Sequence, residues 1–396
     1  MLRWIAQALA VTQLSIRTIP QRLGSSVVAA VGIAGVVVVA VSVLSISEGF
    51  RAAVVGAGSP SRAIVLRNGS DSEMTSGLRG TETDIVKQAP GLARAGTRPL
   101  AAAELFVIID LNKRATGTPA NVPIRGVEAE SIEIRDTFKI TGGRMLQFGT
   151  NEAMVGAAAM RQFAGIDLGA EYVSGQMRLK IVGVFTTGGS VNESEIWADG
   201  KVLQGAYRRG NSYQSVLAKL DSPASFNTFK DWLTTNPQLN VNARRESEFY
   251  LAQTRVMTSL INSIGYIIAG LMAVGAIFGA ILTMNTAVAN RTREIATLRA
   301  LGFNTTAVLV SVLGESLVLS LIGGVAGGLL AYAGFNGYET ATMNFQTFSQ
   351  VAFAFAVTPM LLIKGIGGAT VMGFLGGLFP AIRAARLPIS SALREL

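Results

Sequence analysis

The amino-acid sequence predicts a membrane protein with four transmembrane α-helices and a large α/β extracytoplasmic domain between the first and second helices. Of its 396 residues, 49% are hydrophobic and only 15% are charged, which is too apolar for an ordinary soluble protein. Several uncharged stretches are as long as the roughly 20 apolar residues of helix that a bilayer core requires. The long stretch between the first two of them instead contains strand-like runs separated by Gly and Pro turns.

Arginine is concentrated in three segments, 1–22, 285–305 and 383–396, which we place in the cytoplasm. They contain nine arginines and two glutamates and so supply +7 of the formal net charge of +9. This bias is the positive-inside pattern that sets membrane topology, and it predicts that both termini are cytoplasmic. It also argues against nucleic acid as a partner, which a net positive charge would otherwise suggest.

The N-terminal residues 1–22 are predicted to form an amphipathic helix that lies on the cytoplasmic face of the membrane. Arg3 and Arg17 share a polar arc opposite an apolar arc, and Pro20 ends the segment. A leader that only sets the topology is the alternative. The uncharged residues 23–47 then form the first transmembrane helix. A cleavable signal peptide is less favoured, because the Val-rich stretch is long enough for a full crossing.

Residues 48–255 form the predicted extracytoplasmic domain, since about 200 residues of mixed α/β sequence can bury a core of their own. The composition shows no clean boundary between lobes. Strand-like runs rich in β-branched residues cover 63–66, 105–110 and 179–185, and helix-like runs cover 152–163 and 225–233.

The sequence contains no motif typical of a catalytic, cofactor-binding or metal-binding site, and we predict a non-catalytic chain. There is no His and no Cys, which excludes a Ser–His triad and thiolate metal sites. Neither a P-loop nor a G-x-S-x-G motif is present, and the Gly-rich turns at 142–144 and 188–190 are interpreted as ordinary turns. Glu193 and Glu195 form an acidic pair of the kind that is usually solvated.

Three further transmembrane helices are predicted in the second half of the chain. Between Arg255 and Arg291 there is no charged residue, and between Arg299 and Glu339 there is only Glu315. The predicted segments are a helix at 256–289, a cytoplasmic joint at 290–304, a helix at 305–335, an outer loop at 336–364, a helix at 365–383 and a cytoplasmic tail at 384–396.

The joint at 290–304 is itself predicted to be helical. Ala, Leu, Arg and Glu are strong helix formers, Gly302 is a natural stop, and Arg291 and Glu294 place opposite charges on one face. A short, basic, helical connection suits a firm docking surface better than a slack loop. The alternative is that its arginines only anchor the topology.

Small residues recur four positions apart in the last three predicted helices, a spacing that lets helix backbones approach closely in a bilayer. Packing within the chain and a dimer face are both open interpretations. Apart from Arg383 at the end of the last predicted helix, Glu315 is the one charged residue inside a predicted span, and we expect it to bond to Ser or Thr of a neighbouring helix rather than to couple protons. The small-residue pairs are Gly275 and Gly279, Gly323 and Gly327, Gly324 and Gly328, and Gly373 and Gly377.

These features resemble the FtsX-like and MacB-like permeases of ABC transporters, which share the four-helix layout with one large extracytoplasmic domain. The resemblance is specific in the membrane half and weak across residues 50–250. The motifs that carry it are Ser47-Glu-Gly49, Arg293-Glu-Ile-Ala-Thr-Leu-Arg-Ala-Leu-Gly302, Gly314-Glu315, Phe379-Pro-Ala-Ile-Arg-Ala-Ala-Arg-Leu387 and Ala392-Leu-Arg394. Pro388 departs from the pattern, since it comes earlier than the family's proline.

The resemblance implies a permease subunit of a bacterial inner membrane. Its expected partners are a second permease copy, as a homodimer or a related heterodimer, and a separate cytoplasmic ABC ATPase that binds the ATP. The joint would be a coupling helix in a groove of the ATPase, and ATP-driven movement would reach the extracytoplasmic domain by mechanotransmission. The residues expected to contact the ATPase are Arg291, Arg293, Glu294, Leu298 and Arg299.

The implied output is the export of a substrate, or its extraction from the outer side of the membrane, with a membrane-fusion adaptor as a further partner. The alternative output is the control of an extracytoplasmic enzyme such as a cell-wall hydrolase, as in FtsX-like proteins. A stand-alone receptor would not need the joint together with the C-terminal pattern. A secondary transporter would need polar or discontinuous helices near the bilayer midplane.

Overall fold

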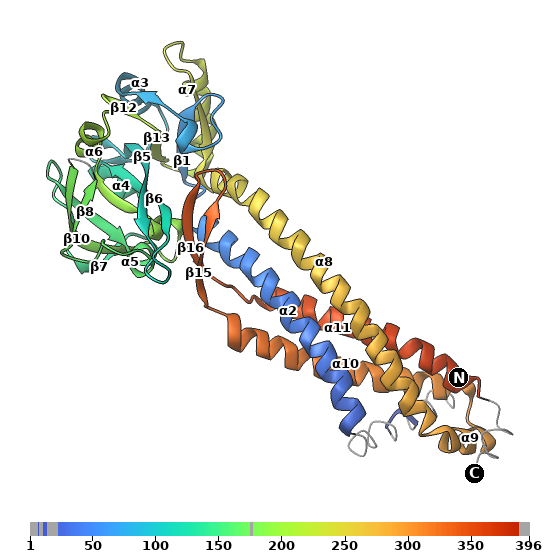
Figure 1. Ribbon diagram of the computed structural model, residues 1–396. Coiled ribbons are helices and arrows are strands. Elements are labelled where there is room, and N and C mark those ends of the chain that lie inside the picture. The colour runs from blue at the N-terminus through green and yellow to red at the C-terminus, as the bar shows by residue number, and fades with distance from the viewer. Residues whose placement is uncertain (1–6, 8–10, 14–22, 175–176, 388–396) are drawn as a thin grey trace. The chain divides into compact units, whose positions relative to one another are not determined.

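The computed structural model describes residues 7, 11–13, 23–174 and 177–387, and it divides into two units (Figure 1). We call the first the helical unit; it spans Met1–Glu48, Leu260–Tyr338 and Phe355–Leu396. The second, the sheet unit, spans Gly49–Ser259 and Glu339–Ala354. Most of the predicted amphipathic helix at 1–22 and of the predicted tail at 384–396 lies outside the described residues.

Among the described residues, four helices are long and apolar enough to cross a membrane. They are α2 (Leu23–Gly56), α8 (Glu246–Ala289), α10 (Thr305–Phe335) and α11 (Pro359–Ala385). The short helix α9 (Thr292–Ala300) connects α8 and α10 within the predicted joint. The predicted fold class of four apolar helices with a large α/β region between the first two is confirmed.

Three of these helices extend beyond the residues predicted for them. α2 continues to Gly56, α8 begins at Glu246 and α11 begins at Pro359. The predicted helices end where charged residues begin, because the prediction rests on the absence of charge. The helices themselves continue, because their charged side chains reach water or a partner. At α11 the start is fixed locally, because the Thr358 hydroxyl accepts a bond from Leu361 N and Pro359 fits the first helical turn.

Small residues bring α10 close to α2 and to α11. A methyl group on Gly323 or Gly327 would lie 2.6 Å from a carbonyl oxygen of α2, and one on Gly373 would lie 2.2 Å from Ser320 Oγ. Gly324 and Gly377 make comparable approaches between α10 and α11. The small-residue pairs of α10 and α11 therefore serve packing within this chain.

The helix α8 presents its small residues differently. A methyl group on Gly275 or Gly279 would meet none of the described residues within 4 Å. Both glycines line an open apolar groove of about 560 Å³ between α2 and α8, together with Val28 and Gly32. This pair therefore does not serve packing among the described residues.

The sheet unit is built on one ten-stranded sheet with the order β14-β1-β13-β5-β6-β11-β8-β10-β7, in which β9 also pairs with β10. The strands are β1 (Arg62–Arg67), β5 (Ala101–Asn112), β6 (Pro119–Val127), β7 (Lys139–Gly143), β8 (Glu152–Gly156), β9 (Glu171–Ser174), β10 (Met177–Thr186), β11 (Ile196–Asp199), β13 (Ser215–Lys219) and β14 (Val241–Arg245). Short strand pairs join β2 (Leu78–Arg79) to β12 (Ser212–Tyr213) and β3 (Arg94–Ala95) to β4 (Arg98–Pro99).

The helices of the sheet unit are short. They are α3 (Gly80–Val86), α4 (Ala129–Ile134), α5 (Ala157–Gln162), α6 (Gly200–Ala206) and α7 (Phe226–Thr235), with 3-10 turns η2 (Glu73–Thr75), η3 (Val191–Ser194) and η4 (Pro223–Ser225). The predicted strands at 63–66, 105–110 and 179–185 are confirmed within β1, β5 and β10. The predicted helix at 152–163 is wrong in its first half, which forms β8, because burial in the middle of the sheet outweighs helix propensity there.

Strand β5 joins two lobes of the sheet unit. Its residues Ala101–Glu104 pair with β13, and Leu105–Asn112 pair with β6. One hydrophobic core forms on the β1 and β13 side around Phe229, and another forms on the β6 and β10 side around Ile124. The boundary between the lobes thus runs through the middle of a continuous strand, which explains why composition does not reveal it.

The predicted outer loop at 336–364 contains a β-hairpin, β15 (Glu339–Asn344) and β16 (Ser349–Ala354), that belongs to the sheet unit. Ser194 Oγ accepts a bond from Ala352 N at 2.9 Å, and Arg161 pairs with Glu339 at 2.9 Å. Phe353 packs edge-on against Phe50 of α2, with ring centroids 5.7 Å apart. The connection between α10 and α11 is therefore folded against the sheet unit.

Candidate functional site

The joint between α8 and α10 folds as a two-turn helix with one buried and one exposed face. Ile295 and Ala296 are buried, and Ile295 belongs to an apolar cluster formed with α8, α10 and α11. Arg293 and Glu294 are exposed on the other face. Gly302 ends the segment with φ +92°, a conformation that favours glycine, as the sequence predicts.

The structure separates the five residues expected to contact an ATPase into two groups. Arg293 and Glu294 are exposed, whereas Leu298 and Arg299 are half-buried. The Arg299 guanidinium donates a hydrogen bond to the carbonyl oxygen of Leu387, beyond the end of α11. Arg291 is buried, with a side chain that is 9% exposed, so it is placed as a structural residue and not as a surface contact.

Arg291 forms an ion pair with Glu315 of α10. Its Nη1 lies 2.8 Å from Glu315 Oε2, and the Glu315 side chain is 5% exposed. The expected bond from Glu315 to Ser or Thr of a neighbouring helix is therefore corrected to a bond with a charged partner. The sequence did not indicate this pair, because only the reversal of the chain through α9 brings Arg291 close to Glu315.

A cavity of about 40 Å³ lies beside this pair, lined mainly by apolar residues of α8, α9 and α10. Such a volume holds about one or two water molecules. It is too small for a transported substrate. The Arg291–Glu315 pair links the start of α9 to α10, and Arg291 Nε also lies 3.9 Å from the exposed carboxylate of Glu294.

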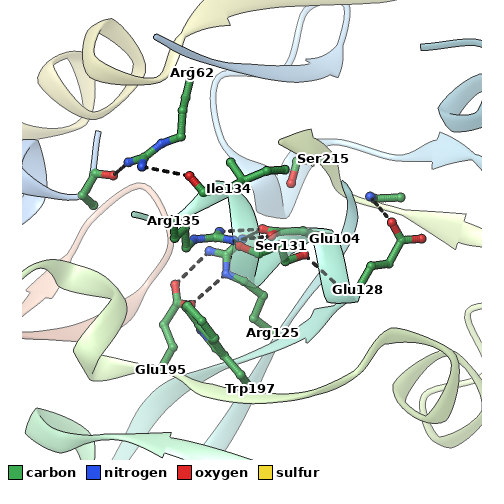
Figure 2. Close-up of polar contacts among 12 residues, drawn as sticks. Arg62, Glu104, Arg125, Glu128, Ser131, Ile134, Arg135, Glu195, Trp197 and Ser215 are labelled. Carbon is green, nitrogen blue, oxygen red and sulfur yellow. Dashed lines mark hydrogen bonds and ion pairs between the residues drawn. The ribbon is translucent and has the colours of Figure 1, made fainter. Parts of the chain in front are cut away.

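The sheet unit contains a second set of buried charges, at the point where β5 changes partner (Figure 2). Arg125 of β6 is 2% exposed and contacts three carboxylates. Its nitrogens lie 2.7 Å from Glu73, 2.8 Å from Glu104 and 2.7 Å from Glu195. We call these four residues together with Arg135 the buried charge cluster.

Arg135 completes the cluster by donating to both carboxylate oxygens of Glu104, at 2.6 and 2.9 Å. Trp197 Nε1 donates to Glu195 at 2.7 Å. Burial alone raises the pKa of Glu104, but Arg135 and Arg125 outweigh it and lower this pKa to about 2. The carboxylate thus stays ionised and keeps both arginines in place.

The cluster corrects the expectation that Glu193 and Glu195 are solvated, because both side chains are buried. Glu193 accepts hydrogen bonds from Thr187 N and Gly189 N, each at 2.7 Å. Its carboxylate therefore stabilises the turn at 188–190. In the part of the chain that the structure describes, no group of three or more His, Asp or Glu residues is arranged to hold a metal ion.

One sequence signal could have indicated the cluster. Glu104 follows three alanines and precedes an apolar run, and Arg125 stands between Ile124 and Gly126. A single charge inside a strand that is otherwise apolar predicts a buried partner of opposite sign, because an isolated buried charge is too costly. The identity of that partner still depends on which strands become neighbours.

Two family models match the chain. The FtsX-like permease C-terminal model matches residues 266–389, and the MacB-like periplasmic core domain model matches residues 26–236, more than half of the chain. With the four apolar helices, these matches define the class as a multi-pass membrane permease of the ABC type. The chain belongs to the family of FtsX-like permeases that carry a MacB-like periplasmic core domain.

Several curated relatives are exporters by name. The chain is 23% identical over 389 residues to the macrolide export ATP-binding/permease protein MacB of Bradyrhizobium diazoefficiens, covering 86% of this chain and 57% of that protein. It is 25% identical over 422 residues to MacB 1/2 of Paracoccus denitrificans, covering 99% of this chain and 59% of that protein. The chain thus spans less than two thirds of the length of these relatives.

Solved structures similar to the chain include the periplasmic region of MacB from Actinobacillus actinomycetemcomitans. It has a TM-score of 0.38 and 10% identity, and the match covers 50% of this chain and 94% of that chain. The extracellular domain of the transporter YknZ has a TM-score of 0.35 and 14% identity, and the match covers 46% of this chain and 99% of that chain.

Proposed function

We propose that this chain is the membrane subunit of an ABC exporter and that α9 is its coupling helix. A cytoplasmic ATPase binds the exposed face of α9, and its ATP-driven movement passes through the helices to the sheet unit on the outer side of the membrane. That movement expels a substrate from the outer side, with a membrane-fusion adaptor as a further partner. The names of the MacB relatives support export as the output.

The observation that carries this proposal is the double attachment of α9. The helix exposes Arg293 and Glu294 while its position is held by the Arg291–Glu315 pair and by Arg299 bound to the end of α11. A helix held at both ends transmits a displacement of the ATPase to the neighbouring helices, whereas a flexible loop would not. Helix α8 then runs without interruption from the joint to Glu246, about 66 Å at 1.5 Å per residue.

Reversing both charges with R293E and E294R tests the ATPase contact. We expect membrane insertion to stay normal and the amount of co-purified ATPase to fall about tenfold or more, since the reversed side chains would face like charges on the ATPase, which strongly disfavours association. R383E is the matched control, because Arg383 is an exposed arginine near the end of α11 and lies outside α9. Unchanged co-purification by the reversed variant refutes the assignment of α9.

Identification of every chain that co-purifies from native membranes tests the output. An ATPase with a membrane-fusion adaptor supports export. An ATPase with an extracytoplasmic hydrolase and without an adaptor overturns export in favour of enzyme control.

The second permease copy is assigned to the open groove between α2 and α8. Gly275 and Gly279 leave room there for a helix of another subunit, and the outward side chains around them are apolar. G275L with G279L is expected to abolish the dimer in detergent, as measured by native mass spectrometry. G270L is the control, because Gly270 also lacks described neighbours within 4 Å but does not line the groove. A dimer that persists in the double variant contradicts this assignment.

A further inference from the structure

Arg62 occupies the place in the sheet unit where the end of α2 and the start of α8 meet. Its side chain is 7% exposed, and its Nε lies 2.5 Å from the Glu246 carboxylate in the first turn of α8. Nη2 donates to the carbonyl oxygen of Ala57, directly after α2, at 2.6 Å. Nη1 donates to the carbonyl oxygen of Ile134, the last residue of α4, at 3.4 Å (Figure 2). One guanidinium thus joins three elements.

The Glu246 side of this contact is equally enclosed. Its side chain is 1% exposed, and Oε2 also accepts a hydrogen bond from Ser59 N at 3.0 Å. The two backbones are in direct contact, since a methyl group on Gly58 would lie 2.8 Å from Ser247 Cα. The end of α2 and the start of α8 are therefore bound to each other by side-chain and backbone contacts.

The same contact leads into the buried charge cluster. Ile134 is followed by Arg135, which bonds to Glu104, and Glu104 also bonds to Arg125. Glu104 lies on β5 at the point where the strand changes partner and the two lobes of the sheet meet. A displacement of α2 and α8 at Arg62 therefore acts on the strand that both lobes share.

We propose that the Arg62–Glu246 pair is the joint that makes α2 and α8 move together and transfers their movement to the sheet unit. Arg62 is in this view a positioning residue, and the role rests on the proposed coupling function. Methionine at one position alone would leave a buried charge uncompensated, which damages folding as well as the joint. Methionine at both positions removes the charges together and so separates the two effects.

The test uses the full chain purified with its ATPase. Because the sequence has no Cys, A52C on α2 and L251C on α8 can carry a pair of spin labels at exposed positions. Electron paramagnetic resonance then gives the distribution of distances between the labels, with and without nucleotide. The thermal unfolding midpoint of each variant reports whether the sheet unit is folded.

In R62M with E246M we expect a folded protein, a distance distribution about twice as wide as that of the parent, and loss of any nucleotide-dependent shift. R62K should fold and show an intermediate width, because one ammonium group cannot reach all three acceptors at once. The control is R178M with E171Q, which removes the exposed 3.7 Å Arg178–Glu171 pair between β10 and β9 and should leave the distribution unchanged.

A folded double variant with the width of the parent overturns the proposal. If the double variant does not fold, R62K is compared with the parent instead, and a distance distribution as narrow as that of the parent overturns the proposal. An absence of any nucleotide-dependent shift in the parent contradicts the proposed coupling function, whereas the widths measured without nucleotide still decide whether Arg62 joins the helices.

Discussion

Replacing Arg125 by methionine is expected to destabilise the sheet unit by about 3–5 kcal/mol, the cost typical of removing one partner from a buried ion pair. The substitution leaves Glu73 and Glu195 buried without their arginine, and only Glu104 keeps a second one, Arg135. Since domains are stable by only about 5–15 kcal/mol, this is the largest effect expected of any substitution considered for this protein.

Denaturant unfolding of the full chain in detergent, followed by tryptophan fluorescence, to which the buried Trp197 contributes, measures this loss. The control is R98M, because Arg98 is exposed and pairs with Glu130 and Glu133 at the surface, where ion pairs contribute little. An R125M midpoint equal to that of the unmodified chain would show that the cluster does not hold the two lobes together.

Replacing Glu315 by leucine is expected to uncouple the chain from its ATPase. The substitution removes the carboxylate 2.8 Å from Arg291 and leaves the exposed Glu294, 3.9 Å from its Nε, so we expect the start of α9 to move as the guanidinium turns toward Glu294 and water. We expect ATP hydrolysis by the complex to lose its response to the permease, with a change of about tenfold, within the range of 1–3 kcal/mol typical of coupling free energies.

A double-mutant cycle separates this effect from a general loss of stability. R291M combined with E315L removes both charges, and it should be less impaired than either single variant by roughly 1–3 kcal/mol. V310A is the control, because Val310 is an exposed residue of α10 that does not contact the pair, and it should behave as the unmodified chain does. Strictly additive effects of the two single changes would mean that the pair does not hold α9.

The two buried ion pairs, Arg291–Glu315 and Arg62–Glu246, stand near opposite ends of α8. Arg291, just after α8, is bound to Glu315 of α10. Glu246, in the first turn of α8, is bound to Arg62 in the segment after α2. Buried ion pairs are rarely a net source of stability, so their presence at these two points agrees with a role in holding a defined geometry. The two experiments test this role independently at each end.

The membrane part of this protein could be predicted directly from the sequence, because the hydrophobic pattern and the charge bias indicate the helices and their topology. A chain segment in lipid must satisfy its own backbone hydrogen bonds, so a long apolar stretch such as 305–335, with Glu315 as its one charged residue, is predicted to be a helix, and α10 occupies those residues. The joint was predictable for the same reason, because Arg293 and Gly302 lie in a short polar interval between two such stretches.

Only the tertiary structure decided the partners of the buried charges. Glu315 and Arg291 are 24 positions apart, and Arg62 and Glu246 are 184 apart, so no local pattern links either pair. The same holds for β8, where residues with good helix propensity form a strand because their neighbours in the sheet are β10 and β11. Apolar character is a property of each residue and is read locally, whereas compensation of a buried charge depends on which distant segments the fold brings within hydrogen-bonding distance.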